Sequence, residues 1–479
     1  MKRHITLFFL LFVALIFSCN KENIQPYKDI DQVNIVSPQD TTITLAQLQQ
    51  LTVSPVLSGI DTKKDYAYEW RLYEDKSYRI LSDKQQLDML VELPVGKYTI
   101  QFQVMDKTTA IKAIGQLYTL NVTGAFPEGW LVGNNNNGKG QMSFIRTSDR
   151  KVFLNPLEDI NQASYPEKLV ASISGVKPTP FYGSFKQLFY FTENGLRVFD
   201  AETMLQTSEL NEYFYKPITF KQQPAYGTNA LNIDQFLINK GDLYAADGLN
   251  FGTNSSFGTF SDRFEGDYSM FPFVFNDASL TTYFYDNKNK RFMSCTYQGR
   301  ELTIASRATS NGQYNLNSIG KTMLGSDATL SGNYLSLMKD DTKSYIYAFR
   351  LRAASAIATG YYSELSGAQE IDQITGFAAA SDIERAYYSS KNKIYKVSAA
   401  NGSVAQIYSF PTGSEIVDLK MLKAGTDANR QLVIAINKGS VGEIHCIYIN
   451  EFGDLDTGKP PIVYSGFGVI TNISYRVAS

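Results

Sequence analysis

Histidine, cysteine and net charge are all scarce in this chain of 479 residues. It has two histidines, three cysteines and a formal net charge of −2. A nearly neutral, slightly acidic chain argues against nucleic acid or an anionic membrane surface as its partner. Apart from His4 near the start, the only histidine is His445 in GEIHCIYIN. No Ser-His-Asp or Cys-His site can be built without it, and its strand-like setting predicts a structural residue.

Metal ligands are equally sparse. One histidine and two separated cysteines, Cys295 and Cys446, cannot supply the usual ligands of a zinc site. The stretch GDLDTGKPP offers Asp454, Asp456 and Gly458, but it lacks the third acidic position and the distal Glu of a calcium loop. We therefore expect a solvated turn there, no metal and no cofactor.

Long apolar runs are confined to the start of the chain, MKRHITLFFLLFVALIFSCN. Lys2 and Arg3 precede an apolar run of about 13 residues, which has the length of a signal-peptide core and is too short to span a bilayer. The Ile-Phe-Ser-Cys sequence that ends at Cys19 resembles the lipobox of bacterial lipoproteins. The resemblance implies a signal peptide over residues 1–18, a lipid on Cys19 and a tether over 19–32. The alternative is an ordinary secretory signal with an incidental cysteine.

The residues after Cys19 indicate where in the cell the protein is located. Asn20-Lys21-Glu22 resembles the surface-export signal of Bacteroidota-type lipoproteins, although Asn23 stands where a second acidic residue is usual. We expect a protein that is anchored to the outer membrane through lipid alone and faces the cell exterior.

Residues 33–123 alternate apolar and polar side chains with a period of two. In YAYEWRLY, Tyr66, Tyr68, Trp70 and Leu72 point one way, and LPVGKYTIQFQVMD repeats the alternation. Strands of this kind predict a β-sandwich over residues 33–123.

The same two stretches resemble the polycystic-kidney-disease (PKD) domain, an immunoglobulin-like sandwich. In that pattern a Trp strand precedes Gly-x-Tyr-x-hydrophobic-x-hydrophobic-x-Val-x-Asp, which Gly96 to Asp106 match. Arg71-Leu72-Tyr73 replace the usual Asp-rich stretch after the Trp. Together with the lipobox, this departure resembles the PKD-like family of surface lipoproteins found beside SusC/SusD-type uptake systems. The resemblance implies a SusC/SusD-type outer-membrane transporter and sibling lipoproteins as partners.

The remainder of the chain, 125–479, repeats at long range. YFYDNKNKRF (283–292) and AYYSSKNKIY (386–395) share two aromatics and a Lys-Asn-Lys turn, and LFYFTENGLRVFD (188–200) has the same layout. Weaker copies begin near Ser143, Leu243, Ser344 and Val433, which makes seven starts spaced by about 48 residues. Hairpin units at this period predict a seven-bladed β-propeller, with GFGVITNISYRV pairing with GWLVG to close the ring. The rival fold is a pair of stacked β-sandwiches.

The propeller prediction separates the two remaining cysteines. Cys295 falls in the fourth unit and Cys446 in the seventh, too far apart for a disulfide. We expect both to be buried thiols that pack as small apolar side chains.

The stretch GLNFGTNSSFGTFSDRFEGDYSMFPFVF (248–275) mixes aromatics with turn-forming residues. Its last three rings, Phe271, Phe273 and Phe275, alternate as in a core strand. The earlier part predicts a rim loop that displays flat rings to a ligand; the alternative is a compact loop that buries them. The candidate ligand-binding residues are Phe251, Phe257, Phe260, Phe264 and Tyr268.

These features favour an all-β, non-enzymatic binding protein. We expect it to assist a SusC/SusD-type transporter in capturing an oligomeric nutrient, either a peptide or a glycan. One alternative is a propeller hydrolase or lyase that acts on a polysaccharide with two carboxylates, although the sequence singles out no pair. The other is a structural scaffold for neighbouring surface lipoproteins.

Overall fold

The computed structural model describes residues 33–36, 40–74, 77–175, 177–179, 183–229, 234–247, 259–276, 280–296, 301–309, 312–329, 333–351 and 360–477. The chain divides into two compact units, Met1–Thr123 (unit 1) and Gly124–Ser479 (unit 2). Both are built almost entirely of β-strands. None of the helices in the described ranges is long and apolar enough to cross a membrane. The expected signal peptide and tether, with Cys19, lie outside the described residues.

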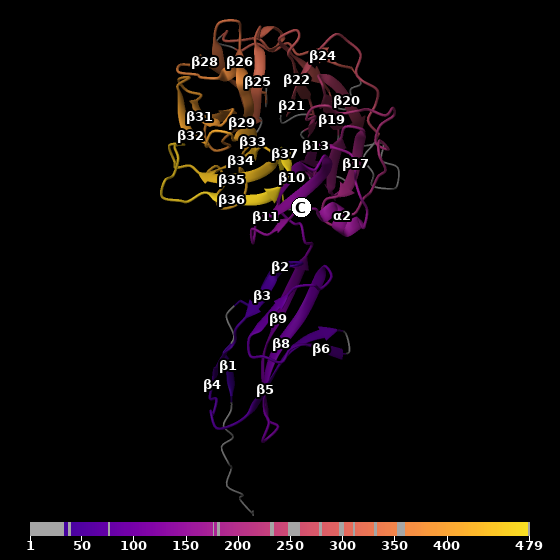
Figure 1. Cartoon of the computed structure of the whole chain (residues 1–479), viewed down its shortest axis with the longest axis vertical. Helices are drawn as coiled ribbons and strands as arrows, with labels where there is room; N and C mark the ends of the chain where they lie inside the picture. The colour runs from indigo at the N-terminus through magenta and orange to yellow at the C-terminus, as the bar shows by residue number, and fades with distance from the viewer. Residues whose placement is uncertain are drawn as a thin grey trace, which may run out of the picture. The chain divides into compact units, whose positions relative to one another are not determined.

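Unit 1 contains a five-stranded sheet of order β2-β9-β8-β5-β6 and two short pairs, β1-β4 and β3-β7 (Figure 1). Its strands are β1 (Asn34–Val36), β2 (Thr42–Ala46), β3 (Gln50–Val53), β4 (Val56–Ser58), β5 (Tyr66–Glu74), β6 (Ser77–Ser82), β7 (Leu87–Leu90), β8 (Gly96–Asp106) and β9 (Lys112–Thr123). β2 runs parallel to β9, and the other neighbours are antiparallel.

The core of unit 1 forms around Trp70, as the alternating pattern predicted. Trp70 is fully buried, packs against Phe102 and Tyr118 with ring centroids 5.0 and 5.9 Å away, and donates its indole N–H to the carbonyl of Gln85. Leu72 is buried on the same face. Burying a large aromatic ring with its one polar atom satisfied is the arrangement expected for the core of an immunoglobulin-like sandwich.

Unit 2 consists, over its described residues, of seven antiparallel sheets and one short pair. Sheet I is β12-β11-β10-β37, sheet II is β13-β16-β17, sheet III is β18-β19-β20, sheet IV is β21 to β24, sheet V is β25 to β28, sheet VI is β29 to β32, and sheet VII is β33 to β36. The short pair is β14 (Lys177–Thr179) with β15 (Gly183–Phe185).

The strands of sheets I to III are β10 (Gly129–Asn136), β11 (Lys139–Arg146), β12 (Val152–Phe153), β37 (Val469–Arg476), β13 (Leu169–Ser174), β16 (Gln187–Thr192), β17 (Gly195–Asp200), β18 (Ala225–Thr228), β19 (Asp234–Asn239) and β20 (Asp242–Asp247). Those of sheets IV and V are β21 (Met270–Asn276), β22 (Thr282–Asp286), β23 (Arg291–Cys295), β24 (Thr303–Ile304), β25 (Thr322–Ala328), β26 (Asn333–Lys339), β27 (Ser344–Arg350) and β28 (Tyr361–Glu364). Sheets VI and VII contain β29 (Ile374–Ala379), β30 (Arg385–Ser390), β31 (Lys393–Ser398), β32 (Val404–Ser409), β33 (Glu415–Met421), β34 (Gln431–Lys438), β35 (Val441–Tyr448) and β36 (Ile462–Phe467).

Within the described ranges, helical structure is limited to three short segments. The described ones are α2 (Pro156–Asn161) and the 3₁₀ turns η2 (Leu316–Ser318) and η3 (Ile371–Gln373). Pro156 stands in the first turn of α2, where its missing N–H has no intrahelical partner to lose.

The repeats seen in the sequence correspond to sheets. Each of the predicted starts lies in a different sheet, in β11, β16, β20, β22, β27, β30 and β34. The two best copies are the hairpins β22-β23 and β30-β31. The sequence periodicity is therefore a periodicity of antiparallel sheets.

The last strand pairs with the first strand of unit 2. β37 runs antiparallel to β10, from Gly129 opposite Arg476 to Asn135 opposite Val469. Figure 1 shows the two strands side by side, one violet and one yellow. This pairing of GWLVG with the C-terminal strand confirms the sequence prediction. It satisfies backbone groups that would otherwise form exposed edges.

Asparagine side chains join successive sheets. In each of three pairs, an amide accepts from the N–H and donates to the C=O of one residue on an edge strand of the next sheet, at 2.8 to 3.1 Å. The pairs are Asn135 with Leu169, Asn287 with Met323, and Asn437 with Ile470. Because a side-chain amide has one donor group and one acceptor group, it can replace a backbone peptide in this role.

Cys295 and Cys446 are both buried, as predicted. Cys295 lies on β23 of sheet IV and Cys446 on β35 of sheet VII. Burial raises the pKa of each thiol to about 12. Both therefore pack as protonated, weakly reactive side chains.

Candidate ligand-binding surface

The aromatic stretch that the sequence marked as a binding loop contributes to the core wherever the structure describes it. Phe260, Phe264 and Tyr268 are 1, 9 and 8% exposed. The prediction that these three rings are displayed is therefore wrong. Phe251 and Phe257 lie outside the described residues.

Hydrogen bonding explains why these rings point inward. Ser261 and Phe264 donate their N–H groups to the carbonyls of Ala245 and Leu243 on β20, at 2.9 and 3.0 Å. The segment thus follows the outer edge of sheet III like a further strand. Phe260 packs in the cluster between sheets II and III, and Phe264 packs with Tyr268 in the cluster between sheets III and IV. Glycine and serine around the rings suggested a loop, but edge pairing overrode that local signal.

The continuation, Phe271, Phe273 and Phe275, forms β21 as predicted. Phe275 is fully buried, and the other two rings pack partly buried against the same cluster. Phe273 and Phe275 meet edge to face with centroids 4.7 Å apart. The three are structural residues of sheet IV.

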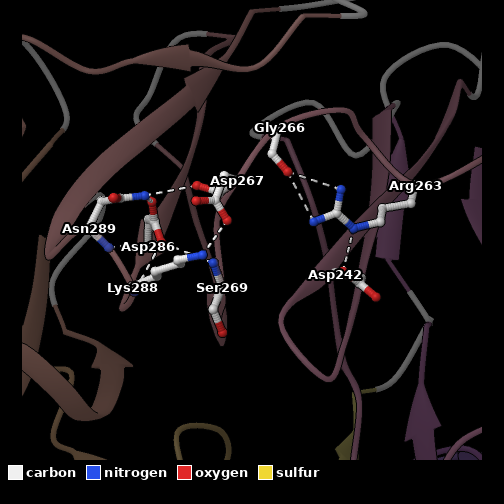
Figure 2. A network of polar contacts seen from close by, with 8 residues as sticks. All are labelled: Asp242, Arg263, Gly266, Asp267, Ser269, Asp286, Lys288 and Asn289. Carbon is white, nitrogen blue, oxygen red and sulfur yellow. Dashed lines mark hydrogen bonds and ion pairs between the residues drawn. The ribbon is translucent and has the colours of Figure 1, made fainter.

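The side chain of Arg263 stabilises the turn between sheet III and sheet IV. Figure 2 shows its guanidinium between the carboxylate of Asp242 and the carbonyl of Gly266. It also lies over the ring of Tyr268, 4.4 Å from the centroid. The bond to Asp242 is the main cause of a raised pKa for Arg263, which keeps the group charged. These contacts fix the backbone on the C-terminal side of Ser261 and Asp262.

Asp286 fastens the other end of the same turn to sheet IV. Its carboxylate accepts from the N–H of Ser269 at 3.0 Å and from the side-chain amide of Asn289 at 2.6 Å. Asn289 also donates to the carbonyl of Asp267, whose side chain pairs with Lys288 (Figure 2). Asp286 is fully buried, so its bonds hold the turn against sheet IV and leave this carboxylate inaccessible to a ligand.

An exposed ring does occur beside this segment, but on a residue that the sequence did not single out. Tyr215 is 74% exposed. Its N–H donates to the carbonyl of Phe260 at 3.1 Å, and the N–H of Phe260 donates to the carbonyl of Tyr213 at 2.8 Å. The stretch NEYFYKP gave no signal for this, since Tyr213 and Phe214 in the same run are buried.

A second exposed ring lies at the β35–β36 turn. Phe452 is 70% exposed, although its backbone is held firmly. Arg385, Lys396 and Tyr387 donate to the carbonyls of Glu451, Phe452 and Gly453, respectively, at 2.9 to 3.3 Å. Gly453 has φ +80, and a Cβ there would lie 2.4 Å from Arg385. Tyr215 and Phe452 are thus exposed aromatic side chains on a hydrogen-bonded backbone, which makes both of them candidate binding residues.

Two carboxylates, each on the first strand of its sheet, are candidates for the acid and base that the hydrolase alternative requires. Asp418 accepts from the N–H groups of Leu419 and Ile473 and pairs with Lys420 at 3.0 Å. Asp327 likewise accepts from Ala328 and Ala379.

Asp327 also pairs with Lys423 at 2.7 Å. Backbone amides and lysines thus occupy the oxygens of both carboxylates, Asp327 and Asp418. This arrangement fastens neighbouring strands and does not resemble an acid and base poised across a substrate.

His445 and the acidic turn have structural contacts, as expected. The Nε2 atom of His445 lies 2.8 Å from Glu443, and its ring meets Phe410 edge to face. Asp454 pairs with Lys396, and Asp456 accepts from the N–H of Gly458. In the described ranges, no group of three or more His, Cys, Asp or Glu side chains is placed to hold a metal.

Two solved structures are distantly similar to this chain. A Bacteroides uniformis protein named as a 6-phosphogluconolactonase is 13% identical, with a TM-score of 0.47, over 73% of this chain and 99% of that one. Kluyveromyces lactis Hsv2 is 8% identical, with a TM-score of 0.38, over 72% and 99%. Values this low transfer no function. No curated protein matches this chain.

A family model does match the N-terminal part. The match begins at residue 22 and continues past Thr123 into the first strands of unit 2. It covers the Trp70 strand and the Gly96–Asp106 strand on which the resemblance was based. Over residues 22–169, the chain matches the PKD-like family.

Proposed function

We propose that this protein is a lipid-anchored binding protein of the outer cell surface. In this proposal it assists a SusC/SusD-type transporter by capturing an oligomeric nutrient and passing it on chemically unchanged. The observation that carries the proposal is the order of segments. A lipobox ending at Cys19 is followed directly by a PKD-like region, the combination that resembles surface lipoproteins beside such transporters.

We also propose that sheets I to VII are the blades of a seven-bladed propeller. Three observations support this: the repeating period, the pairing of β37 with β10, and the asparagine bonds between sheets. First strands of neighbouring sheets also pack together, β25 against β29 and β29 against β33. A propeller would present the turns of its sheets at its two rims, and Tyr215 and Phe452 are exposed rings on segments between strands.

The anchoring part of the proposal is tested with Cys19→Ala. In the native host this change should release the protein from the outer membrane or mis-sort it, since the lipid would be the only attachment. Wild-type protein should be accessible to an added protease on intact cells. Unchanged, detergent-dependent membrane attachment of the Cys19→Ala variant would contradict the lipoprotein reading.

The capture part is tested by deletion. A strain that lacks the protein should take up its oligomeric nutrient more slowly at low concentration, while uptake of the monomer should be unchanged. Reintroducing the wild-type chain should restore uptake. If uptake at low concentration is the same with and without the protein on every oligomer that the host uses, nutrient capture is excluded.

A further inference from the structure

The segment by which the chain enters unit 2 is not an exposed linker. Residues 124–128, called the strap below, belong to no strand, yet Ala125 and Phe126 are only 8 and 3% exposed. Phe126 packs edge to face against Phe144 and Phe153, with ring centroids 5.4 and 5.0 Å away. Segments at domain boundaries are usually exposed and make few contacts. The strap is instead packed onto unit 2.

Strand β11 and the residue after it hold one side of the strap. Arg146 donates to the carbonyl of Ala125 at 2.9 Å. Thr147 donates both its N–H and its hydroxyl to the carbonyl of Glu128 at 3.3 Å. Arg146 is fully buried, and the Asp149 carboxylate accepts from its Nε and Nη2 atoms at 2.9 and 2.7 Å. This bidentate pair fixes the orientation of the guanidinium that bonds the strap.

Strand β37 holds the other side of the strap. Arg476, which is also fully buried, donates to the carbonyls of Phe126 and Pro127. The hydroxyl of Tyr475 donates to the Glu128 carboxylate at 2.5 Å. Together with the contacts from β11, the four consecutive carbonyls of residues 125–128 all accept hydrogen bonds. Two buried arginines thus replace the sheet ladder that this segment lacks.

The strap joins unit 2 at the end of two strand ladders. Gly129, the first residue of β10, lies opposite Arg146 on β11 and opposite Arg476 on β37. A force along the chain that pulls the strap away from unit 2 would reach this end first and would load its strand pairs one after another. The arginine bonds precede the first pair, so they must break before either ladder is loaded.

We propose that Arg146, Arg476 and the strap form a latch that keeps unit 2 folded while the chain is under tension. The lipid on Cys19 would hold one end of the chain, and a ligand or partner bound to unit 2 would pull on the other. That load passes through residues 124–128, because the chain crosses there from one unit to the other. The inference rests on the proposed anchoring and capture, and it adds a mechanical role for two buried arginines.

The test stretches single molecules of the chain from Asn20 onward between handles at its two ends. At constant force in optical tweezers, the measured quantity is the rate at which unit 2 begins to open. Arg476→Ala should raise this rate about tenfold or more, because two bonds from a charged donor are lost. Arg150→Ala is the matched control, since Arg150 is an exposed arginine of the β11–β12 turn. It should keep the opening rate within about twofold of wild type.

Phe260→Ala separates a latch from a general loss of stability. This ring is buried between sheets II and III, so its truncation should lower the free energy of unfolding strongly. The strap, β10 and β37 keep all their contacts in this variant. The rate at which the pulled ends begin to separate should therefore stay close to that of wild type.

Arg146→Lys covers the case in which Arg476→Ala does not fold. A lysine ammonium lacks the planar fork that bonds Asp149 and Ala125 together, so the opening rate should rise here too. Opening rates equal to wild type in the arginine variants would overturn the latch. A rise with Phe260→Ala as large as with the arginine variants would overturn it as well. Neither result bears on anchoring, which Cys19→Ala tests separately.

Discussion

The side chain of Asn472 bonds both backbone groups of Ser172, a residue 300 positions earlier in the chain. Its oxygen accepts from the Ser172 N–H at 2.8 Å, and its amide donates to the Ser172 carbonyl at 2.7 Å. Asn472 lies on the C-terminal strand β37 and Ser172 on β13 of sheet II, and both are fully buried. The last residues of the chain therefore hold two early sheets together.

Replacing Asn472 with Ala should destabilise unit 2. It leaves a buried N–H and a buried C=O without partners, each of which costs about 1–3 kcal/mol. Chemical denaturation followed by fluorescence measures the loss. Asn136→Ala, at an exposed position of β10, is the control and should change stability by no more than about 0.5 kcal/mol. Equal stability of both variants would contradict the role of Asn472 in joining the two sheets.

The Phe260→Ala variant should be strongly destabilised. The ring is 1% exposed and stacks on Phe214, and truncating a buried Phe costs about 3–5 kcal/mol. Tyr215→Ala removes an exposed ring from the adjacent segment and should leave the unfolding midpoint nearly unchanged. A Phe260→Ala protein as stable as wild type would show that this ring is exposed and does not belong to the core.

The free energy of unfolding should depend on the protonation state of Asp340 at low pH. Its carboxylate accepts from the N–H groups of Thr342 and Lys343, the hydroxyl of Tyr345 and the ammonium of Lys321. The bond from Thr342 is the largest of the effects that hold the pKa of Asp340 well below its usual range.

A lowered folded-state pKa means that this stabilisation is complete above the unfolded value of about 3.9 and declines as the pH falls below it. The stability gap between wild type and Asp340→Asn should therefore be constant from neutral pH to about pH 5 and narrow below about pH 4. Urea titrations across this range measure it. Asp341→Asn, at the exposed neighbour, should show no such gap. A gap that widens in acid would be incompatible with the assigned contacts.

The cysteines give a thiol count that also reports on lipidation. In the native protein neither Cys295 nor Cys446 should react with a thiol reagent at neutral pH, since both are buried and the pKa of each is raised to about 12. In denaturant, protein from the native host should show two reactive thiols, because the proposed thioether on Cys19 would block the third of its three cysteines. Three reactive thiols would show that Cys19 carries no lipid.

The sequence predicted features that depend on periodicity. Alternation around Trp70 identified the first sandwich, and the repeated Lys-Asn-Lys turns fell in separate sheets, because side chains alternate regularly on a strand. The pairing of β37 with β10 was also predictable, since an unpaired first strand would leave an exposed edge.

Features that depend on long-range contacts were not predictable. Phe260 and Tyr215 both lie in turn-rich stretches, and only the hydrogen bonds between them decide that the first ring is core and the second is exposed. Glycine and serine near Phe260 favour a turn locally, but the pairing of this segment with the edge strand β20 overrides that preference. The sequence therefore placed the rings of Phe260, Phe264 and Tyr268 at the surface wrongly, and it gave no signal for the exposed ring of Tyr215.

Co-purification with the transporter tests the proposed function most directly. The full chain with a C-terminal tag is expressed in its native host, outer membranes are solubilised in mild detergent, and the captured material is identified and quantified by mass spectrometry. We predict recovery of a SusC/SusD-type transporter in near-equal amount, and its loss with the Cys19→Ala variant. Recovery of the tagged protein alone, from membranes in which the SusC and SusD components still co-purify with each other, would contradict the account.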